Sequence, residues 1–184
     1  MTAQSGSGPQ ATVGPEWPLT IDLGWSGKHS LLRWLNWKAP IKMEQFEYCT
    51  ASRSPTVEEY LHLRSIAGLS AFSQDAARLG LNGTVYSVVV THQGVAVGMG
   101  RLIGDGGCFF QVVDIAVHPD HQGRGLGKII MEAIMAYVSR ELPVSAYVSL
   151  IADVPANKLY EKFGFKETAP RSLGMAYRVT SAGR

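Results

Sequence analysis

The chain has 184 residues, 46% of them hydrophobic, and a formal net charge of +2. This length supports one good hydrophobic core, and the small charge gives no reason to expect a nucleic-acid-binding surface. No apolar run approaches the ~20 residues of a membrane span and the N-terminus lacks a secretory signal layout, so we expect a cytoplasmic protein that does not engage a membrane. Cys49 and Cys108 have neither metal-binding nor redox spacing, so we expect no metal site and no disulfide framework.

We predict an N-terminal extension over residues 1–40, followed by the main domain over residues 41–180. The first 18 or so residues are rich in Gly, Ser, Pro, Thr, Gln and Ala, a composition typical of disorder. The stretch from Trp17 to Pro40 holds all four tryptophans: Trp17, Trp25, Trp34 and Trp37. Their indoles could pack on the main domain, form a dimer contact, or cover the substrate site as a flap.

The first half of the main domain is predicted to begin with a strand over residues 42–51. Ser54-Pro55 indicates the start of a helix that runs through Ile66 and ends at Gly68. A second, shorter helix is expected over residues 73–79.

Two β-rich runs follow, over residues 84–91 and 95–103. They flank His92-Gln93-Gly94, a pattern that predicts a β-hairpin. Asp105-Gly106-Gly107 then turns the chain into the next strand.

The segment from Gln111 to Tyr137 is the most informative part of the sequence. It begins with a nearly continuous apolar run over residues 112–117, typical of a strand covered on both faces. It continues with three glycines at alternate positions in residues 122–128, and then with apolar residues at helical spacing from Leu126 onward. A glycine turn at a helix N-terminus offers unpaired amides and a partial positive charge to an anion, and here Arg124 and Lys128 add to that charge.

Three known types of glycine-rich phosphate turn are alternatives for this segment. A P-loop would require a glycine at Gln122 and a hydroxyl residue at Ile129, and the dinucleotide fingerprint would require its third glycine at Lys128. The pattern that fits is Q-x-x-G-x-G, which Gln122, Gly125 and Gly127 satisfy.

With this pattern the chain resembles the GNAT superfamily of N-acetyltransferases. A second block of that family, A-x-x-LY-x-x-x-GF, follows at the expected distance. It is matched by Ala156, Leu159, Tyr160, Gly164 and Phe165. The resemblance covers residues 42–179 or so and does not reach the tryptophan-rich extension.

The resemblance implies an α/β (mixed α+β) fold, the GNAT acyl-CoA N-acyltransferase fold, in which a central twisted mixed β-sheet carries helices on both faces. The implied order is β-α-α-β-β-β-α-β-α-β-β. It also implies acetyl-CoA as co-substrate, with no metal. The pantetheine arm would pair with backbone around Ile115, Ala116 and Val117, and with the side chain of Asn157. The implied diphosphate site is the turn of Gln122, Gly123, Arg124, Gly125, Leu126, Gly127 and Lys128.

Two residues are candidates for catalysis. The resemblance places the hydroxyl of Tyr160 near the thioester sulfur, as a hydrogen-bond donor first and a full acid second. Many family members carry a base at positions that here hold Gln111 and Val113, so Asp114 is either catalytic or a buried structural carboxylate. A water relay would also serve.

Other polar residues near these motifs are weaker candidates. Asp105 could hold the substrate ammonium. His118 and His121 invite a base or metal reading, but a loop position in solvent explains them better.

The loop over residues 68–75 and the run over residues 98–101 are expected to border the acceptor cleft. Arg101 could bind an acidic group of the acceptor or form a structural ion pair, and Phe72 could stack on an aromatic amine or belong to the core.

The leading prediction is an acetyl-CoA-dependent N-acetyltransferase that acts on a primary amine of a small molecule by direct attack in a ternary complex. The alternatives are acetylation of a protein lysine or N-terminal amine, and a non-catalytic CoA-binding domain. The protein would be a monomer or homodimer.

Overall fold

A computed structural model describes residues 48–179 of the chain. The predicted features of the extension and the first part of the first strand lie outside the described residues. The division of the chain at residue 40 stays a prediction.

A mixed five-stranded sheet forms the centre of the described part, in the order β1-β2-β3-β4-β5. The strands are β1 (Tyr48–Ala51), β2 (Thr84–His92), β3 (Val95–Gly104), β4 (Phe109–Val117) and β5 (Tyr147–Ser149). Neighbouring strands from β1 to β4 are antiparallel, and β5 is parallel to β4.

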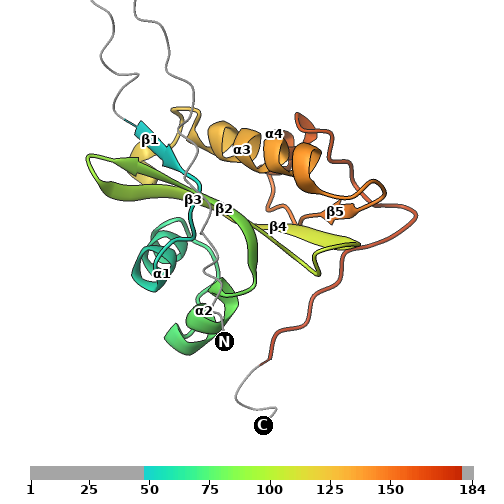
Figure 1. Cartoon of the computed structure of the whole chain (residues 1–184), viewed down its shortest axis with the longest axis horizontal. Helices are drawn as coiled ribbons and strands as arrows, with labels where there is room; N and C mark the ends of the chain where they lie inside the picture. The colour runs from blue at the N-terminus through green and yellow to red at the C-terminus, as the bar shows by residue number, and fades with distance from the viewer. Residues whose placement is uncertain (1–47, 180–184) are drawn as a thin grey trace, which may run out of the picture. The chain divides into compact units, whose positions relative to one another are not determined.

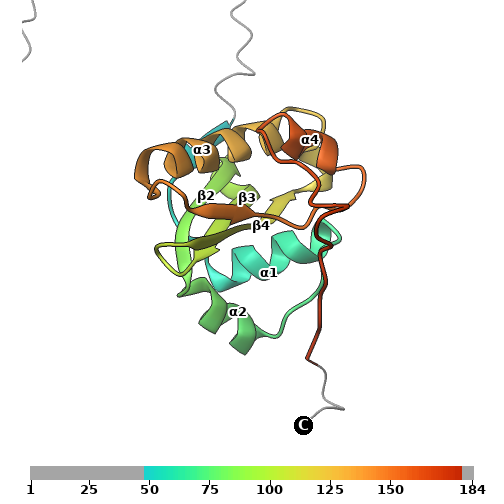
Figure 2. The same ribbon diagram turned by 90° about the vertical axis from the view of Figure 1, so that its right-hand side faces the viewer.

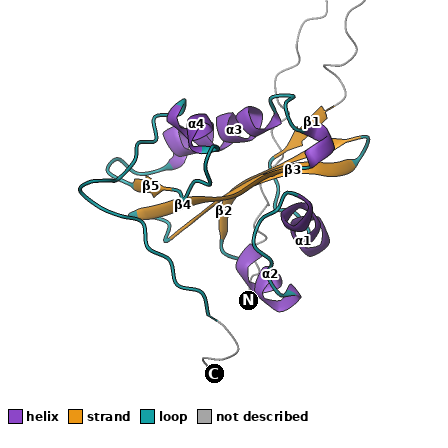
Figure 3. Cartoon of the chain, turned by 180° about the vertical axis from the view of Figure 1, so that it is seen from behind, coloured by secondary structure: helices purple, strands orange, loops and turns teal. Residues whose placement is uncertain are grey.

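Helices cover both faces of this sheet, as predicted. The α-helices are α1 (Val57–Ile66), α2 (Gln74–Leu81), α3 (Leu126–Glu141) and α4 (Asn157–Glu161). Helices α1 and α2 lie on one face, and α3 and α4 lie on the other (Figure 1 and Figure 3).

Local sequence signals explain most element boundaries. The β2–β3 turn has positive φ angles at Gln93 and Gly94, as a tight hairpin requires. Helix α1 is capped by Thr56 rather than by the predicted Ser54-Pro55 pair. The Thr56 side chain accepts from the Glu59 amide while the Glu59 carboxylate accepts from the Thr56 amide, so this capping box decides where the helix starts.

The core has two parts, one on each face of the sheet, because successive strand residues point to opposite sides. Val88 and Val90 belong to the cluster under α3, and Val89 to the cluster under α1. On β3, a Cβ added at Gly100 would lie 2.4 Å from the Ile130 side chain. The glycines of β3 therefore let α3 approach the sheet closely.

The end of the chain differs from the prediction. Two further strands were expected after Gly164, but no strand forms within residues 165–179. Instead the chain turns, with the Ser172 amide donating to the Thr168 carbonyl at 2.9 Å, and Pro170 inside this turn has no amide for a ladder. Figure 2 shows the segment running from the α4 side toward the α1–α2 connection. There Arg178 lies 5.8 Å from the centre of the Phe72 ring.

Candidate active site

An opening between β4 and β5 marks the candidate site. The two strands pair only over Phe109–Gln111 and Tyr147–Ser149. Beyond these pairs they separate, so the β5 side of β4 from Val112 to Val117 has no strand partner among the described residues. A cavity of about 230 Å³ lies along this edge, lined by residues of β4, of the β5–α4 connection and by Tyr160.

A β-bulge at Asp114 shapes β4 at this point. Met99 pairs with Ala116 and Arg101 pairs with Val113, so β4 holds one more residue than β3 between the two pairs. Asp114 has a φ of +58°, a conformation that Asp and Asn tolerate better than most residues. The bulge bends the strand where it leaves β5.

The glycine turn follows β4 directly and ends at the N-terminus of α3. Gly123 and Gly125 have φ angles of +72° and +83°, and Gly125 is the residue that precedes the helix. Within the described residues, the amides from Gly123 to Gly127 donate to no acceptor. Successive free amides at a helix N-terminus are suited to bind an anion, and the diphosphate site at this turn stays a prediction.

The two ends of the predicted diphosphate turn are used internally. The Gln122 amide donates to the Pro119 carbonyl and the Lys128 amide to the Gly125 carbonyl. The Gln122 side chain donates to the Val117 carbonyl at 3.0 Å, so it ties the turn to the end of β4. Gln122 thus shapes the turn, and the amides left for a ligand lie between it and Lys128.

Cationic side chains stand beside these amides. Arg124 is exposed and makes one long contact, 3.4 Å, with the Asp120 carbonyl. Lys128 pairs with Glu132 at 3.1 Å, and both side chains are more than half exposed. Such surface pairs are weak, so both cations remain able to face an anion at the turn.

Helix α4 carries the other two predicted cofactor residues, and Tyr160 is the one of them that lines the cavity along β4. The Asn157 side-chain amide donates to Glu161 at 2.9 Å, while its Oδ1 is buried without a partner. A buried acceptor without a donor is costly, which indicates a ligand donor at this place. Tyr160 is half-buried, and burial, followed by the charge of Asp153, raises its pKa above the usual value. Its hydroxyl therefore stays protonated at neutral pH.

Asp114 lies at the centre of a buried ion cluster. Its carboxylate is paired with Arg64 from α1 and, at 2.8 Å, with Arg101 from β3. The three side chains are only 5–9% exposed. Tyr60 donates its hydroxyl to the same carboxylate at 3.3 Å, and burial, more than the Asp114 charge, raises the pKa of this phenol.

The remaining contacts of the two guanidinium groups tie the helices to the sheet. Arg64 donates to the Ser70 carbonyl, and Arg101 donates to the Thr84 hydroxyl and the Gly80 carbonyl. Both carboxylate oxygens of Asp114 are thus engaged by guanidinium groups. These contacts favour the structural interpretation of Asp114, and they make Arg101 a structural pair rather than a free anion-binding group.

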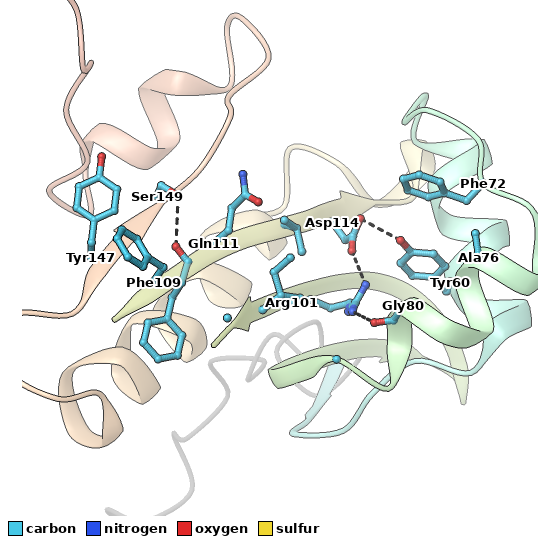
Figure 4. Close-up of a pocket in the computed structure, with 15 residues that line it drawn as sticks. Tyr60, Phe72, Ala76, Gly80, Arg101, Phe109, Gln111, Asp114, Tyr147 and Ser149 are labelled. Atoms are coloured by element: carbon cyan, nitrogen blue, oxygen red, sulfur yellow. Dashed lines mark hydrogen bonds and ion pairs between the residues drawn. The ribbon is translucent and has the colours of Figure 1, made fainter. Parts of the chain in front are cut away.

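A larger cavity of about 830 Å³ lies on the α1–α2 side of the sheet and shares Val113 and Asp114 with the smaller one. Figure 4 shows Phe72 and Tyr60 at one end of it and Phe109 and Tyr147 at the other. Phe72 is 47% exposed, so it is not a core residue, and of the run 98–101 only Arg101 lines the cavity.

Sequence reasoning missed several of these residues. Tyr60, Phe109, Tyr147 and Asp153 belong to no motif that would mark them as site residues. Only the alternation of β4 could have indicated that Phe109 and Gln111 share a face. The meeting of β4 with α1, α2 and β5 required the tertiary structure.

The weaker candidates lie outside both cavities. Asp105 accepts three backbone amides in its turn, and these hydrogen bonds lower its pKa, so the turn accounts for its position. His121 accepts or donates a hydrogen bond with the Tyr48 hydroxyl at 2.9 Å, and its ring lies near those of His92 and His118. These histidines are partly buried rather than free in solvent. In the described residues no group of three His, Cys, Asp or Glu converges as a metal site.

Comparison with known proteins identifies the family. The model of the acetyltransferase (GNAT) domain matches residues 83–167, from the start of β2 to beyond α4. A crystal structure from meticillin-resistant Staphylococcus aureus, a protein of unknown function described as a probable acetyltransferase, is 46% identical. It covers 72% of this chain and 99% of its own, with a TM-score of 0.69.

More distant comparisons agree. The ribosomal-protein-S18-alanine N-acetyltransferase of Escherichia coli shares the fold at 20% identity, over 66% of this chain and 79% of that one, with a TM-score of 0.56. The uncharacterized N-acetyltransferase ycf52 of Porphyra purpurea is 35% identical over 79 residues, which are 43% of this chain. The match spans 44% of that relative's length. The chain belongs to the GNAT acetyltransferase family, and the predicted family and fold class are confirmed.

No helix in residues 48–179 has the length and apolar character needed to cross a membrane.

Proposed function

We propose that the protein is an acetyl-CoA-dependent N-acetyltransferase that moves an acetyl group to a primary amine of a small molecule, by direct attack in a ternary complex. The observation that carries this proposal is that the open edge of β4 leads into the free amides of the glycine turn at the N-terminus of α3. The family supports acetyl transfer, and the site residues and the acceptor are our assignments.

The unsatisfied groups fit coenzyme A in their order and chemistry. The pantetheine arm contains amide groups, which suit the backbone edge of β4 at Ile115 to Val117 and the orphan Oδ1 of Asn157. The diphosphate is an anion, which suits the free amides of residues 123–127 and the positive end of α3. No other described part of the chain combines these features. When bound, acetyl-CoA supplies an activated acetyl thioester.

Tyr160 would protonate or hydrogen-bond the departing sulfur. Tyr160 lines the cavity along β4, and its hydroxyl remains protonated because burial raises its pKa. A thiol has a pKa near ~8.5 and an unperturbed tyrosine near ~10, so a complete proton transfer is uphill by roughly 2 kcal/mol or more. Tyr160 therefore acts first as a hydrogen-bond donor that stabilises developing charge on sulfur.

The acceptor amine has to lose a proton before it attacks. An alkyl amine with a pKa near ~10.4 requires roughly 4–5 kcal/mol for this at neutral pH. Asp153 lines the smaller cavity but is exposed, and the buried carboxylate of Asp114 is held by Arg64 and Arg101 rather than free for the task. These two guanidinium groups outnumber the one carboxylate, and the excess positive charge together with burial lowers the pKa of a bound amine. A water could then carry the proton away.

The proposal is tested by measuring acetyl-CoA binding by calorimetry and thiol release in the presence of an amine panel. The variant Tyr160→Phe should bind acetyl-CoA as the parent does and lose turnover by about 100-fold. Tyr137→Phe is the matched control, because Tyr137 stacks on Tyr86 away from both cavities. Acetyl-CoA that fails to bind would refute the function. Unchanged turnover in Tyr160→Phe would refute only the role of the phenol.

A further inference from the structure

Exposed aromatic side chains lie at both ends of the larger cavity. Phe109 and Tyr147 are 67% and 53% exposed, and their ring centres lie 6.3 Å apart in an edge-to-face arrangement. At the opposite end, Phe72 is 47% exposed. Large aromatic rings left this open to solvent beside a cavity are unusual for a packed domain and indicate a ligand surface.

Phe72 is held in place by a cation. The Arg64 guanidinium lies 4.4 Å from the centre of its ring, and Arg64 is itself fixed by Asp114 and the Ser70 carbonyl. Arg178 of the C-terminal segment lies 5.8 Å from the same ring. Two guanidinium groups therefore lie near the ring, while 47% of the residue stays exposed.

The charged groups at the cavity disfavour the binding of an acceptor that carries more than one positive charge. Of the described residues that line it, only Arg101 and Asp114 are charged, and they neutralise each other. Arg64 and Arg178 add positive charge near Phe72 without a further carboxylate in the lining. A second ammonium group on the acceptor would have to enter this region unpaired, which is costly.

From these observations we infer that the acceptor is an amine with one aromatic ring and no second positive charge, and that Phe72 is a specificity-determining residue that contacts the ring. This inference rests on the proposed acetyl transfer. The cavity of about 830 Å³ lies within the size range of small-molecule sites, roughly 300–1,000 Å³. It meets the β4 opening at Val113 and Asp114, so an amine on a short alkyl arm can point from the Phe72 end of the cavity toward the thioester.

The reaction is balanced without a further reactant. The neutral amine nitrogen forms a bond to the thioester carbonyl carbon, and the carbon–sulfur bond breaks. The nitrogen releases its proton to water, and the sulfur leaves as a thiolate that is hydrogen-bonded by Tyr160. The products are an N-acetylated aromatic amine and coenzyme A.

Three amines of similar basicity separate the contributions. 2-Phenylethylamine has the ring, 2-cyclohexylethylamine has its size without the aromatic character, and 1,4-diaminobutane has a second positive charge. We expect kcat/KM for 2-phenylethylamine to exceed kcat/KM for the cyclohexyl analogue by about 3- to 10-fold, which corresponds to the interaction energy of an aromatic pair. The difference from the diamine should be larger. Preference for the diamine or for a lysine peptide would overturn the inference and leave the proposed function intact. A panel without any acetylated amine, with acetyl-CoA still bound, would overturn both.

Substitutions at the cavity test whether Phe72 contacts the ring of the acceptor. Phe72→Ala should raise KM for 2-phenylethylamine by about 3- to 10-fold, with the affinity for acetyl-CoA unchanged, and Phe72→Tyr should restore it. Leu79→Ala is the control, because Leu79 is an exposed apolar residue of α2 that lines neither cavity. Ala76→Trp should fill the cavity from α2 and abolish acetylation while acetyl-CoA still binds. If Phe72→Ala and Ala76→Trp keep parental kinetics, the acceptor binds elsewhere and the inference is wrong.

Discussion

Replacing Asp114 by asparagine removes one negative charge from the buried cluster and leaves its shape nearly unchanged. Asparagine tolerates the positive φ of this position and keeps one acceptor oxygen, so the substitution isolates the charge. Arg64 and Arg101, whose side chains are 9% and 5% exposed, would lose the one carboxylate that pairs with them within residues 48–179. Breaking a buried ion pair by removing one partner costs about 3–5 kcal/mol, a large part of the ~5–15 kcal/mol that stabilises a typical domain.

Urea denaturation followed by circular dichroism measures this cost as the change in the free energy of unfolding. Asp75→Asn is the matched control, because its pair with Arg78 is 3.4 Å long and both side chains are mostly exposed. It should cost no more than about 1 kcal/mol. A loss below 1 kcal/mol for Asp114→Asn would refute the anchoring role. Parental stability combined with a large loss of turnover would instead make Asp114 the catalytic base.

Three further substitutions test the cofactor turn, the orphan acceptor and the histidine contacts. Gly125→Ala should weaken acetyl-CoA binding measured by calorimetry. Gly94→Ala, in the β2–β3 turn, has nearly the same φ, so it should suffer similar strain and keep its affinity. Asn157→Leu should lower acetyl-CoA affinity by about 10-fold and raise the stability of the free protein, since it removes a buried unsatisfied oxygen. Burial, followed by His92, Arg124 and His118, lowers the pKa of His121. The neutral form of His121 therefore contributes stability that is present above the unfolded pKa near ~6.5 and is lost as pH falls through the lower folded pKa. The variant His121→Gln should show a weaker dependence of stability on pH.

Each of these expectations has a contrary result. Equal affinity in the two glycine variants would remove the turn from the cofactor site. An Asn157→Leu variant less stable than the parent would show that the side chain is satisfied in the free protein. A His121→Gln variant with the parental slope of stability between about pH 5 and 7 would show that other groups set the acid limit.

The elements that sequence predicted well are those with short-range causes. The hairpin turn at Gln93-Gly94 and the glycine turn before α3 depend on backbone angles that few residues adopt, so spacing alone identifies them. The predicted start of α1 was wrong for a related reason. Two capping signals overlap within three residues, and the reciprocal Thr56–Glu59 bonds prevailed over the preceding Ser54-Pro55 pair.

The ion cluster could not be predicted from sequence, because its members are far apart. Arg64 lies 50 residues and Arg101 13 residues before Asp114. Periodicity reports which residues share a face and gives no information on which face of another element they meet. The prediction of two strands after Gly164 was wrong for a different reason. It came from the family resemblance, whereas Pro170 and the turn at Thr168–Ser172 disfavour the backbone hydrogen bonds of a β-ladder.

The uneven pairing of β4 gives this strand two kinds of amide. On one edge they are bonded to β3 along most of the strand, and on the other they meet β5 at three positions only. In hydrogen–deuterium exchange the β3-facing amides should therefore be among the slowest of the sheet, while the alternate ones beyond Gln111 exchange much faster. A cofactor laid along the opening would slow the second class alone, so a single strand reports both the integrity of the core and the occupancy of the site.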